Sequence, residues 1–153
     1  MIVEKRLEEL GLVLPKLQPA SGNFVHAVRV GGLVFASGKG SRNAQGGVIA
    51  GKVGRDVTTA QAKEHARHIG LLLIAVLKQE LGDLDNVKRI VKVLGLVNGT
   101  PEFEEQPIVV NGCSDLLVEV FGEKGNHARS AIGAGSLPNN MTVEIELIAE
   151  AAD

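Results

Sequence analysis

Hydrophobic positions recur along this chain with helical or strand-like spacing, and glycine or proline separates most of the segments. Between residues 2 and 10, apolar side chains recur every three or four positions, and Gly11 follows them. This spacing predicts a short amphipathic helix that ends at the glycine. Pro15 and Pro19 then interrupt the chain, so we expect an irregular lead-in before the main fold.

Two longer segments also have helical spacing. Thr58 and Gln61 form a capping-box pattern, which predicts a helix from there to Leu81, ended by Gly82. Its expected buried face consists of Ala62, Ala66, Ile69, Leu73, Val76 and Leu77. Pro107 is well placed in the first turn of a second helix that ends before Gly122. The expected buried face of that helix consists of Ile108, Gly112, Leu116, Val120 and Phe121.

The remaining apolar segments have the spacing or composition of strands, over residues 24–30, 33–37, 87–97, 129–134 and 141–148. Gly31-Gly32 predicts a tight hairpin turn between the first two strands. In the last strand apolar residues alternate with polar ones, so Glu144 and Glu146 should share the face opposite to Val143 and Ile145.

The element order β-β-α-β-α-β-β predicts one α+β domain over residues 1–153, with residues 1–19 as an N-terminal helix and lead-in. We expect two helices on one face of a mixed sheet. The other face would hold Ile148 and the outward side of strand 87–97, which are too apolar to remain in water. The pattern therefore predicts a homo-oligomer that buries this face, with closed cyclic symmetry.

Composition narrows the possible functions. The 153 residues contain 44% hydrophobic and 22% charged residues, which is typical of a folded soluble protein. The net charge is −2 and aromatic residues make up only 3%, so a nucleic-acid-binding surface is not expected. A single cysteine excludes an internal disulfide framework. Because the N-terminus lacks a signal-peptide pattern and no apolar run reaches the length of a membrane span, we expect a cytoplasmic protein.

Several apparent motifs for nucleotide binding, metal binding or catalysis are better explained by structural roles. The glycine-rich segment 38–54 includes a P-loop-like stretch from Gly46 to Val53, but Val53 replaces the hydroxyl residue that a magnesium site needs. His65 and His68 could form half a metal site, yet their charged neighbours favour a solvated helix face. Cys113 is expected to be a buried, inert thiol. No G-x-S-x-G nucleophile elbow is present.

The C-terminal third contains the most informative residues, an arginine on one predicted strand and a glutamate on the next. They lie in Ala128-Arg129-Ser130, Leu137-Pro138 and Val143-Glu144-Ile145-Glu146. Together these segments closely resemble the C-terminal signature of the YjgF/RidA family of reactive-intermediate deaminases, also described as L-PSP endoribonucleases or translation inhibitors. The segment from Ala27 to Gly38 is similar to the first hairpin of that family, and Asn111 matches a family asparagine. The resemblance covers about residues 20–150.

The resemblance implies a chorismate-mutase-like α+β fold and a homotrimer with three clefts between subunits. It also implies hydrolysis of enamine or imine intermediates, such as 2-aminoacrylate, to 2-keto acids and ammonia, with no metal or organic cofactor. Arg129 would hold the substrate carboxylate and Glu144 would position or activate the attacking water. Other residues expected to complete the pocket are Phe24, Ser37, Gly38, Asn111 and Ala131.

Departures from the family pattern leave other functions open. Phe24 stands where the family usually has a tyrosine, and Ala131 where a cysteine is common. The N-terminal helix, the glycine-rich loop and Gly133-Ala134-Gly135 indicate an outlying subgroup. The first alternative is a trimeric binder of small keto acids or other carboxylates without turnover. The second is an endoribonuclease, which the acidic net charge and the lack of an aromatic stacking platform disfavour.

Overall fold

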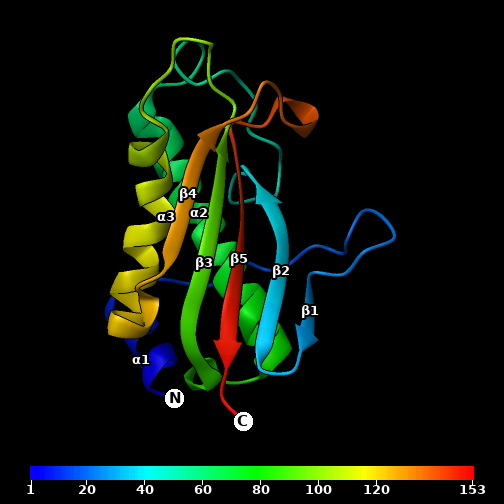
Figure 1. Ribbon diagram of the computed structural model, residues 1–153, viewed down its shortest axis with the longest axis vertical. Coiled ribbons are helices and arrows are strands. Elements are labelled where there is room, and N and C mark those ends of the chain that lie inside the picture. The colour runs from blue at the N-terminus through cyan, green and yellow to red at the C-terminus, as the bar shows by residue number, and fades with distance from the viewer.

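The computed structural model describes all residues from 1 to 153 and confirms the predicted order of elements (Figure 1). The helices are α1 (Ile2–Glu9), α2 (Thr59–Leu81) and α3 (Gln106–Phe121), and the strands are β1 (Ala27–Val30), β2 (Leu33–Gly40), β3 (Val87–Val97), β4 (Ala128–Gly133) and β5 (Val143–Ala151). Short 3-10 helices lie at Leu84–Asn86, Gly122–Gly125 and Pro138–Asn140. None of the helices combines the length and the apolar character that crossing a membrane would require.

The five strands form one mixed sheet in the order β1-β2-β5-β3-β4. Only β3 and β4 are parallel, and α3 connects them on the same face of the sheet that α2 covers (Figure 1). The β1–β2 hairpin turns at Gly31, whose φ of 58° is a conformation that glycine adopts without strain. This arrangement is the α+β architecture predicted from the sequence, with the long helices on a single face.

Helix α2 begins as its capping box predicts. The Thr58 hydroxyl accepts from the Gln61 N–H, and the Gln61 side chain accepts from the Thr58 N–H. Gly82 ends the helix with a φ of 77°. All six residues expected on its inner face are buried in the core.

Helix α3 differs from the prediction at one position. Ile108 is 42% exposed rather than buried, and Val109, Val110 and Cys113 face the interior instead. Gly112 lies where α3 touches α2, and a Cβ atom built there would be 2.0 Å from the Lys63 carbonyl oxygen. We attribute the rotation of α3 about its axis to this contact, because the spacing of apolar residues alone did not predict which side chains are buried.

The face of the sheet away from the helices carries apolar side chains that no element covers. Val28 of β1 lies opposite Phe35 of β2, and Phe35 lies opposite Ile148 of β5. Val28 and Phe35 are exposed and Ile148 is half-buried. The prediction of an apolar second face is therefore confirmed at Ile148, whereas the outward side of β3 is mixed, because it carries Lys92 as well as Leu94 and Leu96.

The long loop between β2 and α2 begins at Ser41, because Gly38–Gly40 belong to β2. Ser41 is fully buried, accepts from the Thr142 N–H at 3.0 Å and donates to the Ile49 carbonyl at 2.7 Å. The P-loop-like stretch ends at Val53, which is buried and bridges to Gly99 rather than opening a helix. The loop is thus tied to the end of the sheet by hydrogen bonds.

Candidate functional site

The sheet register places the two expected catalytic residues on opposite faces of the sheet. Arg129 of β4 lies opposite Val93 of β3, which is buried beneath the helices. Glu144 of β5 lies opposite Leu96, three positions further along β3. Because side chains alternate between faces, Arg129 points to the helix side and Glu144 to the open side. The two residues therefore do not meet within one chain, and an ion pair between them is excluded there.

The guanidinium of Arg129 is held by neutral groups on α3. Its Nη1 donates to Asn111 Oδ1 at 2.7 Å and to Ser114 Oγ at 3.3 Å. Asn111 lies in the second turn of α3. Nη2 and Nε make no hydrogen bond within the chain, and no carboxylate pairs with Arg129. A half-buried guanidinium with two unused donor groups is suited to binding an anion.

A serine and a histidine that the sequence analysis did not identify extend this network. Ser114 Oγ lies 2.9 Å from His127 Nε2, and His127 Nδ1 lies 2.6 Å from the Gly125 carbonyl oxygen. Since a carbonyl only accepts, Nδ1 carries the proton in neutral His127 and Nε2 accepts from the Ser114 hydroxyl. Ser114 follows Asn111 by three residues, so their shared helix face was the available signal.

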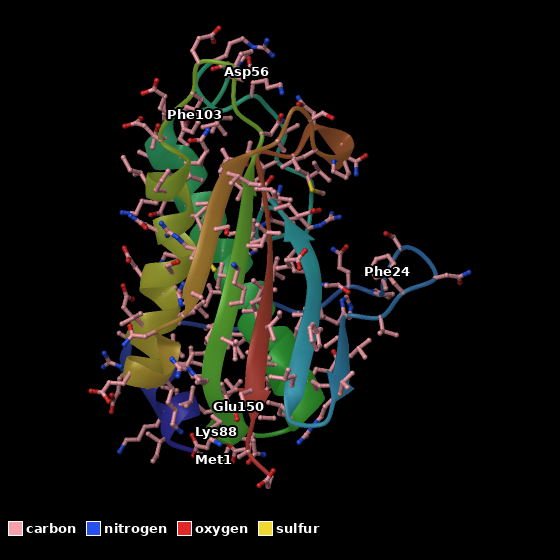
Figure 2. The ribbon with its side chains drawn as sticks, viewed as in Figure 1. Met1, Phe24, Asp56, Lys88, Phe103 and Glu150 are labelled. Carbon is pink, nitrogen blue, oxygen red and sulfur yellow. The ribbon has the colours of Figure 1, made fainter.

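Of the other expected site residues, the structure brings Gly38 to Glu144, whereas no contact joins Ser37 or Phe24 to it. A Cβ atom added to Gly38 would be 3.3 Å from Glu144 Cδ, so glycine leaves room for this carboxylate. The Glu144 side chain makes no hydrogen bond or ion pair in the chain. The Ser37 hydroxyl donates a hydrogen bond to the Val25 carbonyl oxygen at 2.6 Å. Phe24 is 51% exposed on the segment before β1, beside the sheet (Figure 2).

Ala131 belongs with Arg129 rather than with Glu144. It follows Arg129 by two residues in β4, so it faces α3, and it packs partly buried against the core. One chain thus carries an arginine half-site of Arg129, Asn111 and Ala131, and a glutamate half-site of Glu144 and Gly38.

The sequence predicted that the histidines of α2 lie on a solvated face, and this prediction was wrong. His65 and His68 are both half-buried, and burial lowers the pKa of each. His65 Nδ1 lies 2.8 Å from Thr142 Oγ1, whereas His68 lines a cavity. Cys113 is buried as predicted, and burial raises the pKa of its thiol to about 12. That thiol is protonated at neutral pH and is not a nucleophile.

Comparison with known proteins gives one consistent result. Residues 4–151 match the family model described as "YjgF/chorismate mutase-like, putative endoribonuclease". Protein TCP17 of Trypanosoma cruzi is 39% identical over 149 residues, which cover 97% of this chain and 93% of that protein.

Two solved structures are similar over nearly the whole chain. A protein of unknown function, Atu1372 of Agrobacterium tumefaciens, has a TM-score of 0.89 and 40% identity over 99% of this chain and 93% of its own. A structure from Shewanella oneidensis, described as a "putative endoribonuclease", has a TM-score of 0.92 and 35% identity over 97% and 98%. The resemblance carried by Arg129, Glu144 and the first hairpin is thereby confirmed at the level of the family: this chain belongs to the YjgF/Rid family and has its chorismate-mutase-like fold.

Proposed function

We propose that this protein hydrolyses small enamine or imine acids to 2-keto acids and ammonia, in clefts between the subunits of a homotrimer. The observation that carries the proposal is the Arg129 guanidinium, held at Nη1 by neutral oxygens and free at Nη2 and Nε. An imino acid presents a carboxylate next to its electrophilic carbon, so binding at Arg129 would place that carbon at a fixed distance from the guanidinium.

The separation of the half-sites supports a cleft made by two subunits. A head-to-tail interface joins two different surfaces, and a ring of such interfaces closes with cyclic symmetry. In this arrangement the arginine half-site of one subunit meets the glutamate half-site of its neighbour. The same contact would bury the apolar row formed by Val28, Phe35 and Ile148.

The proposed reaction needs only the groups of these two half-sites. Arg129 binds the carboxylate with two parallel hydrogen bonds, and Asn111 keeps the guanidinium in place. An enamine first tautomerises to the imine. Glu144 then accepts a proton from water as the oxygen attacks the imine carbon, and it returns the proton to nitrogen. The hydroxyl proton of the resulting carbinolamine then passes to its nitrogen, and the C–N bond breaks, which releases ammonia and leaves a C=O group.

A carboxylate binder without turnover would use Arg129 in the same way, and an activity assay separates the two functions. Amino acids are fed to an imine-generating oxidase, and release of keto acid and ammonia is followed with and without the protein. A charge-assisted contact is worth about 1.5–3 kcal/mol, so Arg129→Ala should lower kcat/KM roughly ten- to a hundred-fold. Arg129→Lys should recover part of the loss, because lysine keeps the charge but not the fork. Arg55→Lys, at an exposed arginine, is the control.

Glu144→Gln should lower turnover while keto-acid affinity stays nearly constant. The two-subunit cleft is tested by refolding Arg129→Ala and Glu144→Gln together in equal amounts. Random mixing would give about a quarter of the clefts both intact groups, restoring about that share of wild-type turnover. A monomer mass by light scattering at micromolar concentration, or mixed trimers without restored activity, would refute the shared cleft. Keto-acid binding without product release would favour the binder.

A further inference from the structure

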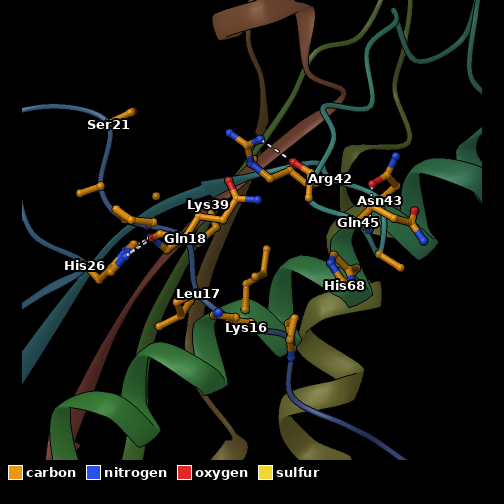
Figure 3. A pocket seen from close by; sticks show the side chains of 18 of the residues that line it. Lys16, Leu17, Gln18, Ser21, His26, Lys39, Arg42, Asn43, Gln45 and His68 are labelled. Atoms are coloured by element: carbon orange, nitrogen blue, oxygen red, sulfur yellow. Dashed lines mark hydrogen bonds between the residues drawn. The ribbon is translucent and has the colours of Figure 1, made fainter.

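A cavity of about 540 Å³ opens beside β2, between the N-terminal lead-in, α2 and the start of the 41–57 loop (Figure 3). A register shift in β2 between Ala36 and Lys39 turns Lys39 to the helix side, away from Glu144. Of the 19 residues that line the cavity, five are basic and none is acidic. The basic residues are Lys16, His26, Lys39, Arg42 and His68. We call this cavity the basic pocket.

The charges in the basic pocket have no anionic partner in the chain. Lys39 Nζ lies 2.5 Å from His26 Nδ1, and His26 Nε2 lies 2.7 Å from the Gln18 carbonyl oxygen. Because that carbonyl only accepts, His26 carries its proton on Nε2, and the Lys39 ammonium donates to Nδ1. Lys39 is therefore held in place by an imidazole nitrogen and not by a carboxylate.

Arg42 adds a second cation that is only partly used. Its Nη1 donates to the Gly46 carbonyl at 2.8 Å, and the guanidinium makes no ion pair. The pKa of Lys39 is lowered, first by burial and then by the positive charge of Arg42. Two unpaired cations kept together at a half-buried position repel each other, and a bound anion would relieve this repulsion.

We propose that the basic pocket binds a small phosphomonoester, with Lys39 and Arg42 as its principal charged contacts. A phosphate dianion matches two convergent cations, whereas one carboxylate would balance a single charge. Lysine suits the phosphate as a point charge and arginine as a hydrogen-bonding fork. The volume leaves room for an organic group beyond the phosphate.

The basic pocket is separate from the arginine half-site in the fold. Arg129 lies on β4 at one edge of the sheet, and Lys39 lies on β2, with β5 and β3 between them. Gly38 lines the basic pocket and also contacts Glu144 of the glutamate half-site, so the two sites adjoin there. The inference goes beyond the proposed deaminase activity and does not depend on it.

Calorimetric titration with ribose 5-phosphate, ribose and inorganic phosphate tests the proposal at low salt. Ribose 5-phosphate should bind to the wild-type protein and ribose should not, while inorganic phosphate should bind more weakly because the organic group adds contacts. Lys39→Met and Arg42→Gln should each weaken binding about ten- to a hundred-fold. Lys52→Met is the matched control, since Lys52 Nζ donates to the Gly135 carbonyl outside the pocket.

Thermal unfolding of the same variants gives a second readout. If Lys39 lacks an anionic partner, Lys39→Met should unfold at the wild-type temperature or above it, so weaker binding could not be attributed to misfolding. No binding of ribose 5-phosphate at millimolar concentration would overturn the proposal, as would equal affinity in the wild type, Lys39→Met and Arg42→Gln. Inorganic phosphate binding as tightly as ribose 5-phosphate would overturn the assignment to a phosphomonoester.

Discussion

Replacing Gly112 with alanine tests the contact that holds α3 against α2. A Cβ atom at this position would be 2.0 Å from the carbonyl oxygen of Lys63 and 2.9 Å from its carbonyl carbon. It would also be 3.1 Å from the Arg67 nitrogen. All three atoms belong to the α2 backbone, so no side-chain rotation relieves the overlap. The helices must separate, and Asn111 and Ser114 would move with α3.

The expected magnitude follows from two opposing effects. Alanine is favoured over glycine in a helix by about 0.8–1 kcal/mol, which alone would stabilise the variant. Overpacking a close contact costs about 1–3 kcal/mol, occasionally more, and a backbone overlap belongs at the upper end. We expect a net loss of about 2 kcal/mol in the free energy of unfolding. With a slope of about 2 kcal/mol per molar urea, the midpoint would fall by about 1 M.

Gly70→Ala is the matched comparison, because Gly70 lies in α2 on the opposite side of the same contact. Its added Cβ would be 2.8 Å from Leu116 Cδ2, which is the end of a flexible side chain. The loss should therefore be clearly smaller than for Gly112→Ala. Urea unfolding of both variants at one fixed protein concentration measures the difference. A Gly112→Ala protein as stable as the wild type, or more stable, would refute the argument.

Two further predictions concern ionisable groups. Cys113, with its pKa raised to about 12 by burial, should react with a thiol reagent at pH 8 only when urea unfolds the chain, and fast labelling of the native protein would contradict its burial. The Met1 amino group, followed by the N–H groups of Val3 and Ile2, lowers the pKa of Asp85 far below its usual range. Asp85 thus stabilises the fold above the unfolded-state pKa of about 3.9, and this contribution is lost as the pH falls further. Asp85→Asn should be less stable than wild type at pH 7, and the two denaturation midpoints should converge in acid; a constant difference would contradict the linkage.

Local signals were sufficient to predict most of the fold. The Thr58 capping box and Gly82 set the ends of α2, and the β-branched run from Val87 to Val97 forms β3 with the predicted bounds. These features depend on neighbours in the sequence, which explains why they could be predicted. The prediction that Ile108 is buried was wrong, because the rotation of α3 depends on the close approach at Gly112. That approach is a contact between segments that are distant in the sequence.

The arrangement of the candidate site could be predicted only in part. The sequence identified Arg129, Glu144 and Asn111, and the structure joins Arg129 to Asn111. It could not reveal the registers of β4 and β5 on β3, which place Arg129 and Glu144 on opposite faces. The basic pocket was also missed, because Lys39 enters it through a register shift in β2 that no hydrophobic pattern indicates.

The hydrogen bonds around Arg129 have a consequence for binding entropy. A free arginine side chain loses about 2 kcal/mol of rotamer entropy when it is fixed in one conformation. Here Asn111, and Ser114 backed by His127, hold Nη1 already in the unliganded chain. Much of that entropy is therefore lost when the protein folds. An anion that binds Nη2 and Nε then causes little further loss of entropy in the Arg129 side chain. A small ligand that makes few contacts can then bind with useful affinity, because the ordering of the side chain no longer opposes it.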